Sequence, residues 1–227
     1  MNAVSGCLSI VFAFSGNLML AGLLILIAAI FDFFDGMLAR LLKAYSEIGK
    51  ELDSLADDIS FGVAPSVIAF ILIRNNLCSP SIPFANQSTS TIILCLLPFT
   101  MAAFSALRLA KFNIDTRQTD KFIGLPTPAN AMVWASIPFI AHYNADCFFV
   151  KYIMSPYVLI ALSLVMSGLL VCELPLFSLK FKKWDFASNK VRYLFLFASL
   201  LLIVVMQFAS IPAIILLYVI VSIFFKV

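Results

Sequence analysis

Five aspartates interrupt two otherwise apolar stretches in the first third of the chain. They are Asp32, Asp35, Asp53, Asp57 and Asp58. A carboxylate at membrane depth costs at least a few kcal/mol, and such residues usually mark a functional site. Asp32 and Asp35 are three residues apart, and Asp53 and Asp57 are four apart, so each pair shares one face of a helix. The spacing therefore predicts two acidic stripes on neighbouring helices.

A hairpin would bring these two stripes together. In antiparallel helices that turn near residue 44, residues with the same index sum lie at one level. Asp32 then lies level with Asp57, and Gly36 lies level with Asp53. At 1.5 Å per residue, the deepest level is roughly 18 Å along the helix from the turn. We expect part of this length to project into the headgroup layer, so that the site opens to the cytoplasm.

Four converging carboxylates need cations, because their mutual repulsion is otherwise unbalanced. Arg40 is the one basic residue close in sequence on the same face. An all-oxygen site with shared carboxylates suits Mg²⁺ or Mn²⁺, especially where substrate phosphates complete the coordination. The alternative interpretation is that the aspartates pair with lysines or line a cation channel. Asp58 lies about 100° round the helix from the stripe, and we expect it to support the site or to pack.

The composition is that of an integral membrane protein. Of the 227 residues, 63% are hydrophobic and 12% are charged, whereas soluble domains carry about 25% charged residues. A helix needs roughly 20 residues to cross a bilayer. By that measure the apolar runs give about eight spans, near residues 2–15, 18–43, 46–73, 91–111, 127–144, 154–172, 192–209 and 211–226. We predict an all-α polytopic transmembrane helical bundle, with tight turns at Gly16-Asn17 and around residues 210–212. Because the first span is short, we expect it to extend upstream of Met1.

The basic residues divide sharply between the two sides of this arrangement. Thirteen of the fifteen fall on one side, and Arg74 and Lys151 fall on the other. The positive-inside rule makes the larger set cytoplasmic, and with it both termini. The net charge of +3 is too small and too scattered to indicate a nucleic acid partner. The five cysteines stand singly in apolar stretches, so we expect reduced thiols that fill the core.

The aspartates belong to one continuous motif. From Asp32 the chain reads DFFDGMLAR, then eight residues, then GKELDSLAD, which is D-x2-D-G-x2-A-R-x8-G-x3-D-x3-D. This pattern closely resembles the signature of the CDP-alcohol phosphatidyltransferases. The resemblance implies a catalytic six-helix core (1–172) within a single membrane domain (1–227). A basic cytoplasmic loop (173–191) and two C-terminal spans (192–227) would follow the core. The resemblance also implies a homodimer.

The same resemblance implies a role for each motif residue. Asp32, Asp35, Asp53 and Asp57 would bind two Mg²⁺ or Mn²⁺ ions, and Asp57 would also act as the general base. The residues that would bind CDP-diacylglycerol are Asp35, Gly36, Ala39, Arg40, Gly49 and Asp53. The ions neutralise charge on the transferred phosphoryl group, while the base deprotonates the acceptor hydroxyl. The implied reaction transfers the phosphatidyl group of CDP-diacylglycerol to an alcohol and releases CMP.

Three further stretches resemble the bacterial members of this family that use L-serine. They are ELDSLADDISFGVAPS (51–66), LRLAKFN (107–113) and FIGLPTPAN (122–130). We therefore expect phosphatidylserine synthesis in a bacterial inner membrane, with membrane lipids as further partners. A zwitterionic acceptor needs a cation for its carboxylate. The candidate acceptor-binding residues are Arg108, Lys111, Asn113 and Lys121.

Two other functions stay open on the sequence. The same reaction with glycerol 3-phosphate or inositol phosphate would demand more cations around the cytoplasmic mouth than can be placed. A divalent-cation transporter would carry its aspartates near the bilayer midplane on non-adjacent helices, whereas here they crowd one predicted hairpin. His142, the only histidine, is predicted to lie towards the outer side, away from the aspartates.

Overall fold

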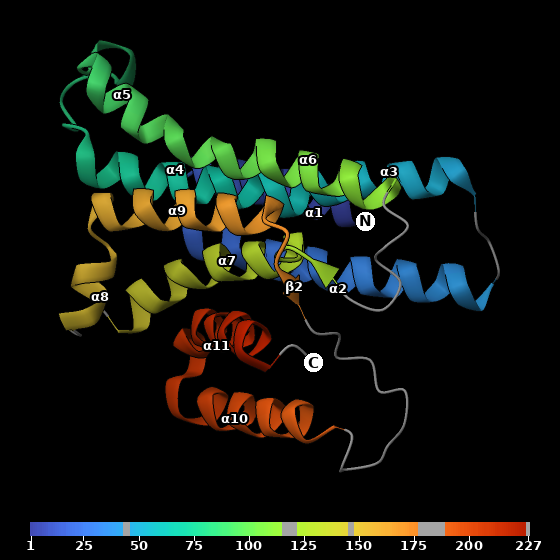
Figure 1. The fold of residues 1–227 in the computed structure, drawn as a ribbon. Coiled ribbons are helices and arrows are strands. Elements are labelled where there is room, and N and C mark those ends of the chain that lie inside the picture. The colour runs from blue at the N-terminus through green and yellow to red at the C-terminus, as the bar shows by residue number, and fades with distance from the viewer. Residues whose placement is uncertain (43–45, 115–121, 145–147, 177–188, 226–227) are drawn as a thin grey trace.

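Helices make up most of the computed structural model, which describes residues 1–42, 46–114, 122–144, 148–176 and 189–225 (Figure 1). The α-helices are α1 (Asn2–Phe14), α2 (Leu18–Leu41), α3 (Glu47–Asp57), α4 (Ala64–Leu77), α5 (Thr89–Leu96), α6 (Thr100–Ile114), α7 (Thr127–Tyr143), α8 (Phe148–Ile153), α9 (Pro156–Val171), α10 (Lys190–Met206) and α11 (Ser210–Phe225). The shorter elements are the π-helical segment η1 (Asp58–Val63), the 3-10 segments η2 (Phe84–Asn86), η3 (Leu97–Phe99) and η4 (Gln207–Ala209), and the strands β1 (Phe122–Ile123) and β2 (Pro175–Leu176).

Each predicted span coincides with a helix or with a run of joined helices, which confirms the helical membrane bundle. α3, η1 and α4 join into one helix of 31 residues, Glu47–Leu77, and α5, η3 and α6 join into one of 26 residues, Thr89–Ile114. Within the described part of the chain, four stretches are long and apolar enough to cross a bilayer. The other two are α2 and the stretch Lys190–Phe224.

The stretch Lys190–Phe224 is a hairpin and not one rod. Gln207 has a φ of 48° and ends α10, so α10 and α11 fold back on each other (Figure 1). The prediction of a turn at residues 210–212 was wrong by a few residues. Pro212 falls in the first turn of α11, where its missing N–H costs nothing, and the helix therefore begins before it.

The turn between α1 and α2 lies where the sequence predicts it. Gly16 has a φ of 85°, a conformation that side chains rarely adopt. The side chain of Asn17 then accepts a hydrogen bond from the backbone N–H of Leu20 at 3.1 Å and so begins α2.

The core lies along α4 and α7. Every residue from Ala64 to Ile73 is buried, and so is every residue from Val133 to Ile140. A helix that is apolar and buried all round belongs in the middle of a bundle. The neighbouring α2 approaches α7 closely at Gly22, where a Cβ would collide with the carbonyl oxygen of Ala135. These central contacts fix the direction in which α2 continues towards its acidic end.

Two features depart from the predicted pattern. β1 and β2 form an antiparallel pair, Phe122 with Leu176 and Ile123 with Pro175. The sequence analysis had placed both strands in loops, one before the span at 127–144 and the other after the span at 154–172. Two-residue strands carry no alternation that a sequence could reveal. The four cysteines within the described residues are free thiols, but they do not all stand alone: Sγ of Cys78 and Sγ of Cys95 are 3.7 Å apart.

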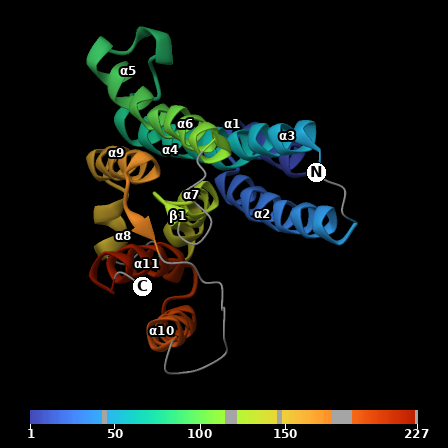
Figure 2. The ribbon, with the colours of Figure 1, turned by 45° about the vertical axis from the view of Figure 1, so that its right-hand side comes forward.

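The C-terminal hairpin covers one side of the bundle. α11 packs against α7 and β2, and α10 lies on the outer side of α11 (Figure 2). The hairpin therefore touches the core through α11 and through η4, whose Phe208 stacks on Phe139 of α7.

Candidate active site

The two acidic stripes meet as the index sums predict. Carboxylate oxygens of Asp32, Asp35 and Asp53 all lie within 4.8 Å of one another. The carboxyl group of Asp57 is within hydrogen-bonding reach of that of Asp32. Four predicted metal ligands from α2 and α3 thus form one cluster, which we call the acidic cluster.

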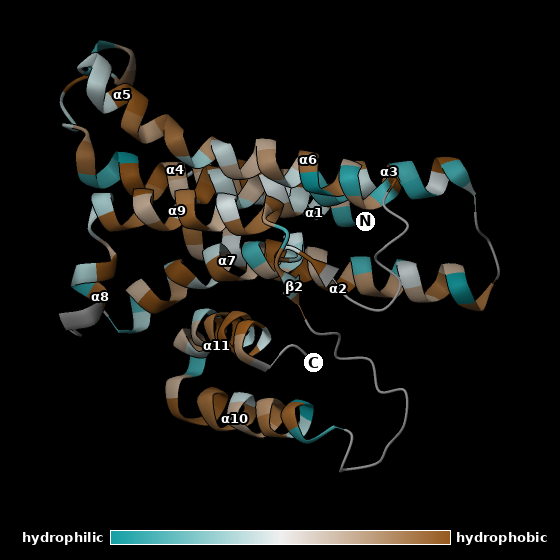
Figure 3. Cartoon of the chain, in the orientation of Figure 1, coloured by the Kyte–Doolittle hydropathy of each residue, from teal (hydrophilic) through white to brown (hydrophobic). Residues whose placement is uncertain are grey.

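The elements that carry the acidic cluster project from the end of the bundle. α2 and α3 extend beyond most of the other helices (Figure 1), and polar residues concentrate on them and on the end of α6 (Figure 3). Ser46 begins α3, because its Oγ accepts a hydrogen bond from the Gly49 N–H at 3.0 Å. The predicted hairpin turn, near residue 44, lies outside the described residues.

A cavity of about 650 Å³ opens between these two helices and the start of α1. Its size suits a small-molecule ligand. Its lining includes all six residues predicted to bind CDP-diacylglycerol, namely Asp35, Gly36, Ala39, Arg40, Gly49 and Asp53. Met1, Asn2 and Ala3 line it from the α1 side, which the sequence motif does not include.

Asn2 is a site residue that the sequence analysis missed. Its side-chain Nδ2 donates a hydrogen bond of 2.8 Å to Oδ1 of Asp57, and Asn2 is 2% exposed. A buried amide that holds a carboxylate orients that carboxylate. The available signal was a lone asparagine at the edge of an apolar helix, which gives no indication of its partner 55 residues away.

The segment that follows Asp57 is π-helical. π-helical turns are rare and occur frequently at functional sites. Within η1, Asp58 turns off the acidic stripe as predicted, and its buried Oδ1 lies beside Gly62 and close to Ser105 of α6. η1 packs against α6 and α7, so the end of the aspartate helix is held by the core.

The four candidate acceptor-binding residues have different surroundings. Arg108 is 8% exposed, has Asp57 as a charged neighbour, and its Nε has no hydrogen-bond partner among the described residues. Lys111 is exposed. Asn113 links α6 to α3 by two hydrogen bonds. Its side-chain amide donates to Oγ of Ser54 at 2.9 Å, and its backbone carbonyl oxygen accepts from Nζ of Lys50 at 2.9 Å. Lys121 lies outside the described residues.

Comparison with known protein families identifies the family to which this chain belongs. A sequence model described as CDP-alcohol phosphatidyltransferase matches residues 1–169, well over half of the chain. The chain belongs to the CDP-alcohol phosphatidyltransferase family. The match includes all eight fixed positions of the motif and the whole lining of the cavity.

Several similar proteins of this family have been named. A CDP-diacylglycerol–serine O-phosphatidyltransferase of Bacillus subtilis is 39% identical over 138 residues, which are 61% of this chain and 71% of that protein. One of Helicobacter pylori is 39% identical over 130 residues, 56% of this chain and 49% of that protein. An archaetidylserine synthase of Methanothermobacter thermautotrophicus is 32% identical over 171 residues, 73% of this chain and 63% of that protein. The match thus spans about half of the Helicobacter relative.

The acidic cluster of this CDP-alcohol phosphatidyltransferase fits divalent cations. Two oxygens bound to one Mg²⁺ at about 2.1 Å lie roughly 3 to 4 Å apart. The oxygens of Asp32, Asp35 and Asp53 lie within 4.8 Å of one another, so small side-chain movements suffice to place them around one ion. Their oxygen-only chemistry suits Mg²⁺ or Mn²⁺ better than a softer metal.

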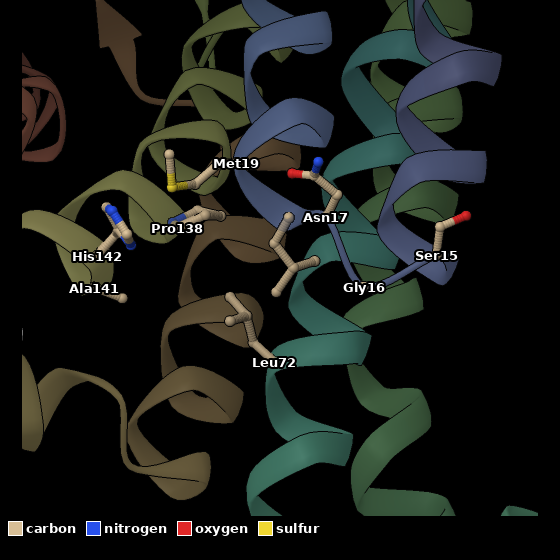
Figure 4. A pocket seen from close by; sticks show the side chains of 9 residues that line it. Ser15, Gly16, Asn17, Met19, Leu72, Pro138, Ala141 and His142 are labelled. Carbon is tan, nitrogen blue, oxygen red and sulfur yellow. The ribbon is translucent and has the colours of Figure 1, made fainter.

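A second hollow, of about 480 Å³, lies at the other end of the helical bundle. It is formed by the α1–α2 turn, Leu72 of α4 and the end of α7, and His142 is part of its lining (Figure 4). Its lining contains no carboxylate. His142 therefore lies away from the acidic cluster, as predicted.

Proposed function

We propose that this chain transfers the phosphatidyl group of CDP-diacylglycerol to L-serine, giving phosphatidylserine and CMP. The observation that carries the proposal is the cavity beside the acidic cluster, which all six motif residues predicted to bind CDP-diacylglycerol line together. The names of the Bacillus and Helicobacter relatives support serine as the acceptor. The chain would thus act as a membrane-embedded transferase.

The reaction exchanges one phosphorus–oxygen bond for another. The serine hydroxyl oxygen attacks the phosphorus that carries diacylglycerol, and the bond from that phosphorus to the CMP oxygen breaks. The hydroxyl proton passes to the Asp57 carboxylate, and CMP leaves with the electron pair of the broken bond. Asn2 holds Asp57 at 2.8 Å in the orientation that receives this proton.

Two divalent ions, Mg²⁺ or Mn²⁺, complete the proposed site. Asp32, Asp35, Asp53 and Asp57 would hold them. When bound, such ions neutralise phosphate charge and lower the barrier to phosphoryl transfer. Arg40 and Asp35 line the cavity on α2, and Gly49 lines it on α3. The nucleotide would therefore bind between these two helices.

The surroundings of Arg108 favour serine over the anionic acceptors. A single buried guanidinium balances one carboxylate. Glycerol 3-phosphate and inositol phosphate carry about two charges on their phosphate groups, and the neighbouring Lys111 is exposed. A divalent-cation transporter is disfavoured as well, because the aspartates gather on two consecutive helices at one end of the bundle.

The proposed setting is a bacterial inner membrane with the acidic cluster at its cytoplasmic face. The division of basic residues supports this orientation, with both termini cytoplasmic. Membrane lipids surround the apolar helix faces, and we propose a homodimer as the working form.

The decisive experiment measures CMP release from CDP-diacylglycerol by purified protein with a panel of acceptors. Release should depend on L-serine and should be far slower with glycerol 3-phosphate or inositol phosphate. EDTA should abolish it, and Mg²⁺ or Mn²⁺ should restore it. Release that follows glycerol 3-phosphate would disprove the serine assignment, and full turnover without metal would disprove the metal site.

A further inference from the structure

Two thiols meet at the end of the bundle opposite the acidic cluster. Sγ of Cys78 and Sγ of Cys95 are 3.7 Å apart, although the two residues are 17 positions apart in the chain. Cys78 directly follows the last residue of α4, and Cys95 lies in α5 (Figure 1). We call these two residues the thiol pair. The thiol of Cys172, by contrast, donates to the Leu169 carbonyl oxygen of its own helix.

The loop between α4 and α5 is packed so that it holds the thiol pair together without a covalent bond. Nε2 of Gln87 donates to the carbonyl oxygens of Ser79 at 3.0 Å and of Ile82 at 2.9 Å. The ring of Phe84 lies edge-on to that of Phe70 in α4, with the ring centroids 5.5 Å apart. α5 also packs directly against α4. The two sulfur atoms are therefore neighbours because of the folded structure around them.

The two thiols differ in their access to the surroundings. Cys78 is partly exposed and lines a cavity of about 470 Å³, whereas Cys95 is 0% exposed. Arg74 lines the same cavity as Cys78, and a nearby cation favours the thiolate, which is the reactive form. An accessible cysteine with a second cysteine in reach is the usual arrangement of an attacking and a resolving thiol.

The proposed orientation places the thiol pair outside the cytoplasm. Arg74, one turn before Cys78, is one of the two basic residues assigned to the outer side. Disulfides form and persist in the bacterial periplasm, whereas cytoplasmic thiols are kept reduced. The surroundings of the thiol pair would thus be oxidising.

We propose that Cys78 and Cys95 are oxidised to a disulfide that links the end of α4 to α5. The oxidant is a protein disulfide of the periplasm. The Cys78 thiolate attacks it, so that a mixed disulfide forms and one thiolate of the oxidant leaves. The Cys95 sulfur then attacks the Cys78 sulfur and releases the second thiolate. The two protons and two electrons of the thiol pair pass to the oxidant, which becomes a dithiol. The inference goes beyond the proposed function, because it involves neither the donor nor the acceptor.

The test counts free thiols in a variant that keeps only the thiol pair, made by Cys7→Ser, Cys147→Ser and Cys172→Ser. Cells of a bacterial host with an oxidising periplasm are precipitated in acid, which stops thiol exchange, and are then treated with a maleimide-linked polyethylene glycol. Each free thiol adds a visible increment of mass on a gel. Unreduced protein should take up no label, and protein reduced beforehand should take up two. A further Cys95→Ser is the control and should give one label in both samples.

A second readout uses the unaltered chain and so does not depend on the folding of a variant. Mass spectrometry of unreduced peptides should find Cys78 linked to Cys95. Reduction should lower the melting temperature in detergent by about 5 to 10 °C, because a disulfide restricts the unfolded chain. Two labels on the unreduced variant would overturn the inference, and an unchanged melting temperature would overturn the stabilising role of the link. Neither readout requires CMP release, so a failure here leaves the proposed function untouched.

Discussion

Asp57 lies between three groups that act on it differently. Asp32 adds a second carboxyl within hydrogen-bonding reach, Asn2 donates a hydrogen bond, and Arg108 supplies a nearby positive charge. A hydrogen bond to one oxygen orients a carboxylate, which serves metal binding and proton transfer alike. The arrangement therefore suits a residue that shares in cation binding and also accepts a proton.

Substitution of Asp57 and Asp53 by asparagine should separate these two roles. Asp57→Asn keeps a ligating oxygen and removes the proton-accepting charge, so turnover should fall by about 10²- to 10⁴-fold while CDP-diacylglycerol binding persists. Asp53→Asn removes a charge from the shared cation site and should weaken nucleotide binding as well. Calorimetric binding of CDP-diacylglycerol beside initial rates measures both. Equal loss of binding in the two variants would show that Asp57 is chiefly a ligand.

Asn2→Ala should lower kcat without loss of CDP-diacylglycerol binding. The amide no longer orients Asp57, and the loss of a hydrogen bond to a carboxylate is worth about 1.5 to 3 kcal/mol, or roughly tenfold to a hundredfold in rate. Asn76→Ala is the control, because that amide donates to the Leu72 carbonyl oxygen at 2.8 Å at the other end of the bundle. An unchanged kcat in Asn2→Ala would mean that Asp57 holds its orientation without this contact.

How far the sequence predicts individual residues depends on the range of their contacts. Asp32 and Asp57 could be paired from the sequence because a hairpin relates them by simple arithmetic on residue numbers. Asn2 could not, because it meets the site through packing between helices that are far apart in the chain. For Asn113 the structure shows a contact that the sequence does not reveal: its side-chain amide donates to Oγ of Ser54, while acceptor binding by this residue stays a prediction.

Among the elements, η1 joins a helix that lines a cavity to a helix that is buried on every side. α3 has no buried residue, whereas ten consecutive residues of α4 are buried. The tightest point of the joint is Gly62, where a Cβ would lie 2.5 Å from Asp58 Oδ1 and 2.9 Å from Ser105 Oγ. The packing of the joint thus depends on the absence of one side chain.

Gly62→Ala and Gly36→Ala should therefore have opposite effects. Alanine normally favours a helix over glycine by about 1 kcal/mol, but overpacking at Gly62 costs about 1 to 3 kcal/mol, so the melting temperature should fall. At Gly36 a Cβ meets nothing within 4 Å, so stability should hold or rise. Because Gly36 lines the cavity, its variant should bind CDP-diacylglycerol more weakly. Thermal melts and binding of both variants measure this, and a stable Gly62→Ala would contradict the packing at η1.

The helical elements could be predicted from the sequence because long apolar runs leave few alternatives. The π-helical turn, the two-residue strands and the short helix α8 could not, because each is fixed by tertiary packing and not by a local pattern. The turn at Gln207 was missed for a related reason. Non-glycine residues seldom adopt a positive φ, and nothing in the local sequence marks this one.

The whole molecule has chemically different ends. One end carries the acidic cluster and its cavity. The other carries the hollow around His142, the last turn of α4, where Arg74 lies, and the loop that follows it. The proposed topology places the first end in the cytoplasm.

Single cysteines introduced into a variant without native cysteines test this topology. Ser79→Cys, exposed at the outer loop, should react in intact cells with a thiol reagent that does not cross membranes. Glu47→Cys, exposed at the start of α3, should react only after the cells are opened. The reverse pattern of labelling would invert the orientation derived from the basic residues.

The π-helical segment also gives this helix one place that can absorb a change in length. A π turn holds one residue more than an α turn, so deletion of a single residue within Asp58–Val63 would let the segment wind as an ordinary α-helix. The shorter α turn covers about the same rotation as the π turn that it replaces, so Asp53 and Asp57 would still face Asp32 and Asp35. A deletion between Asp53 and Asp57, where no wide turn can absorb it, would instead turn Asp53 by about 100° away from the acidic cluster. Two deletions of equal size, a few residues apart in one helix, would thus differ in whether the reactive half keeps its phase relative to the buried half.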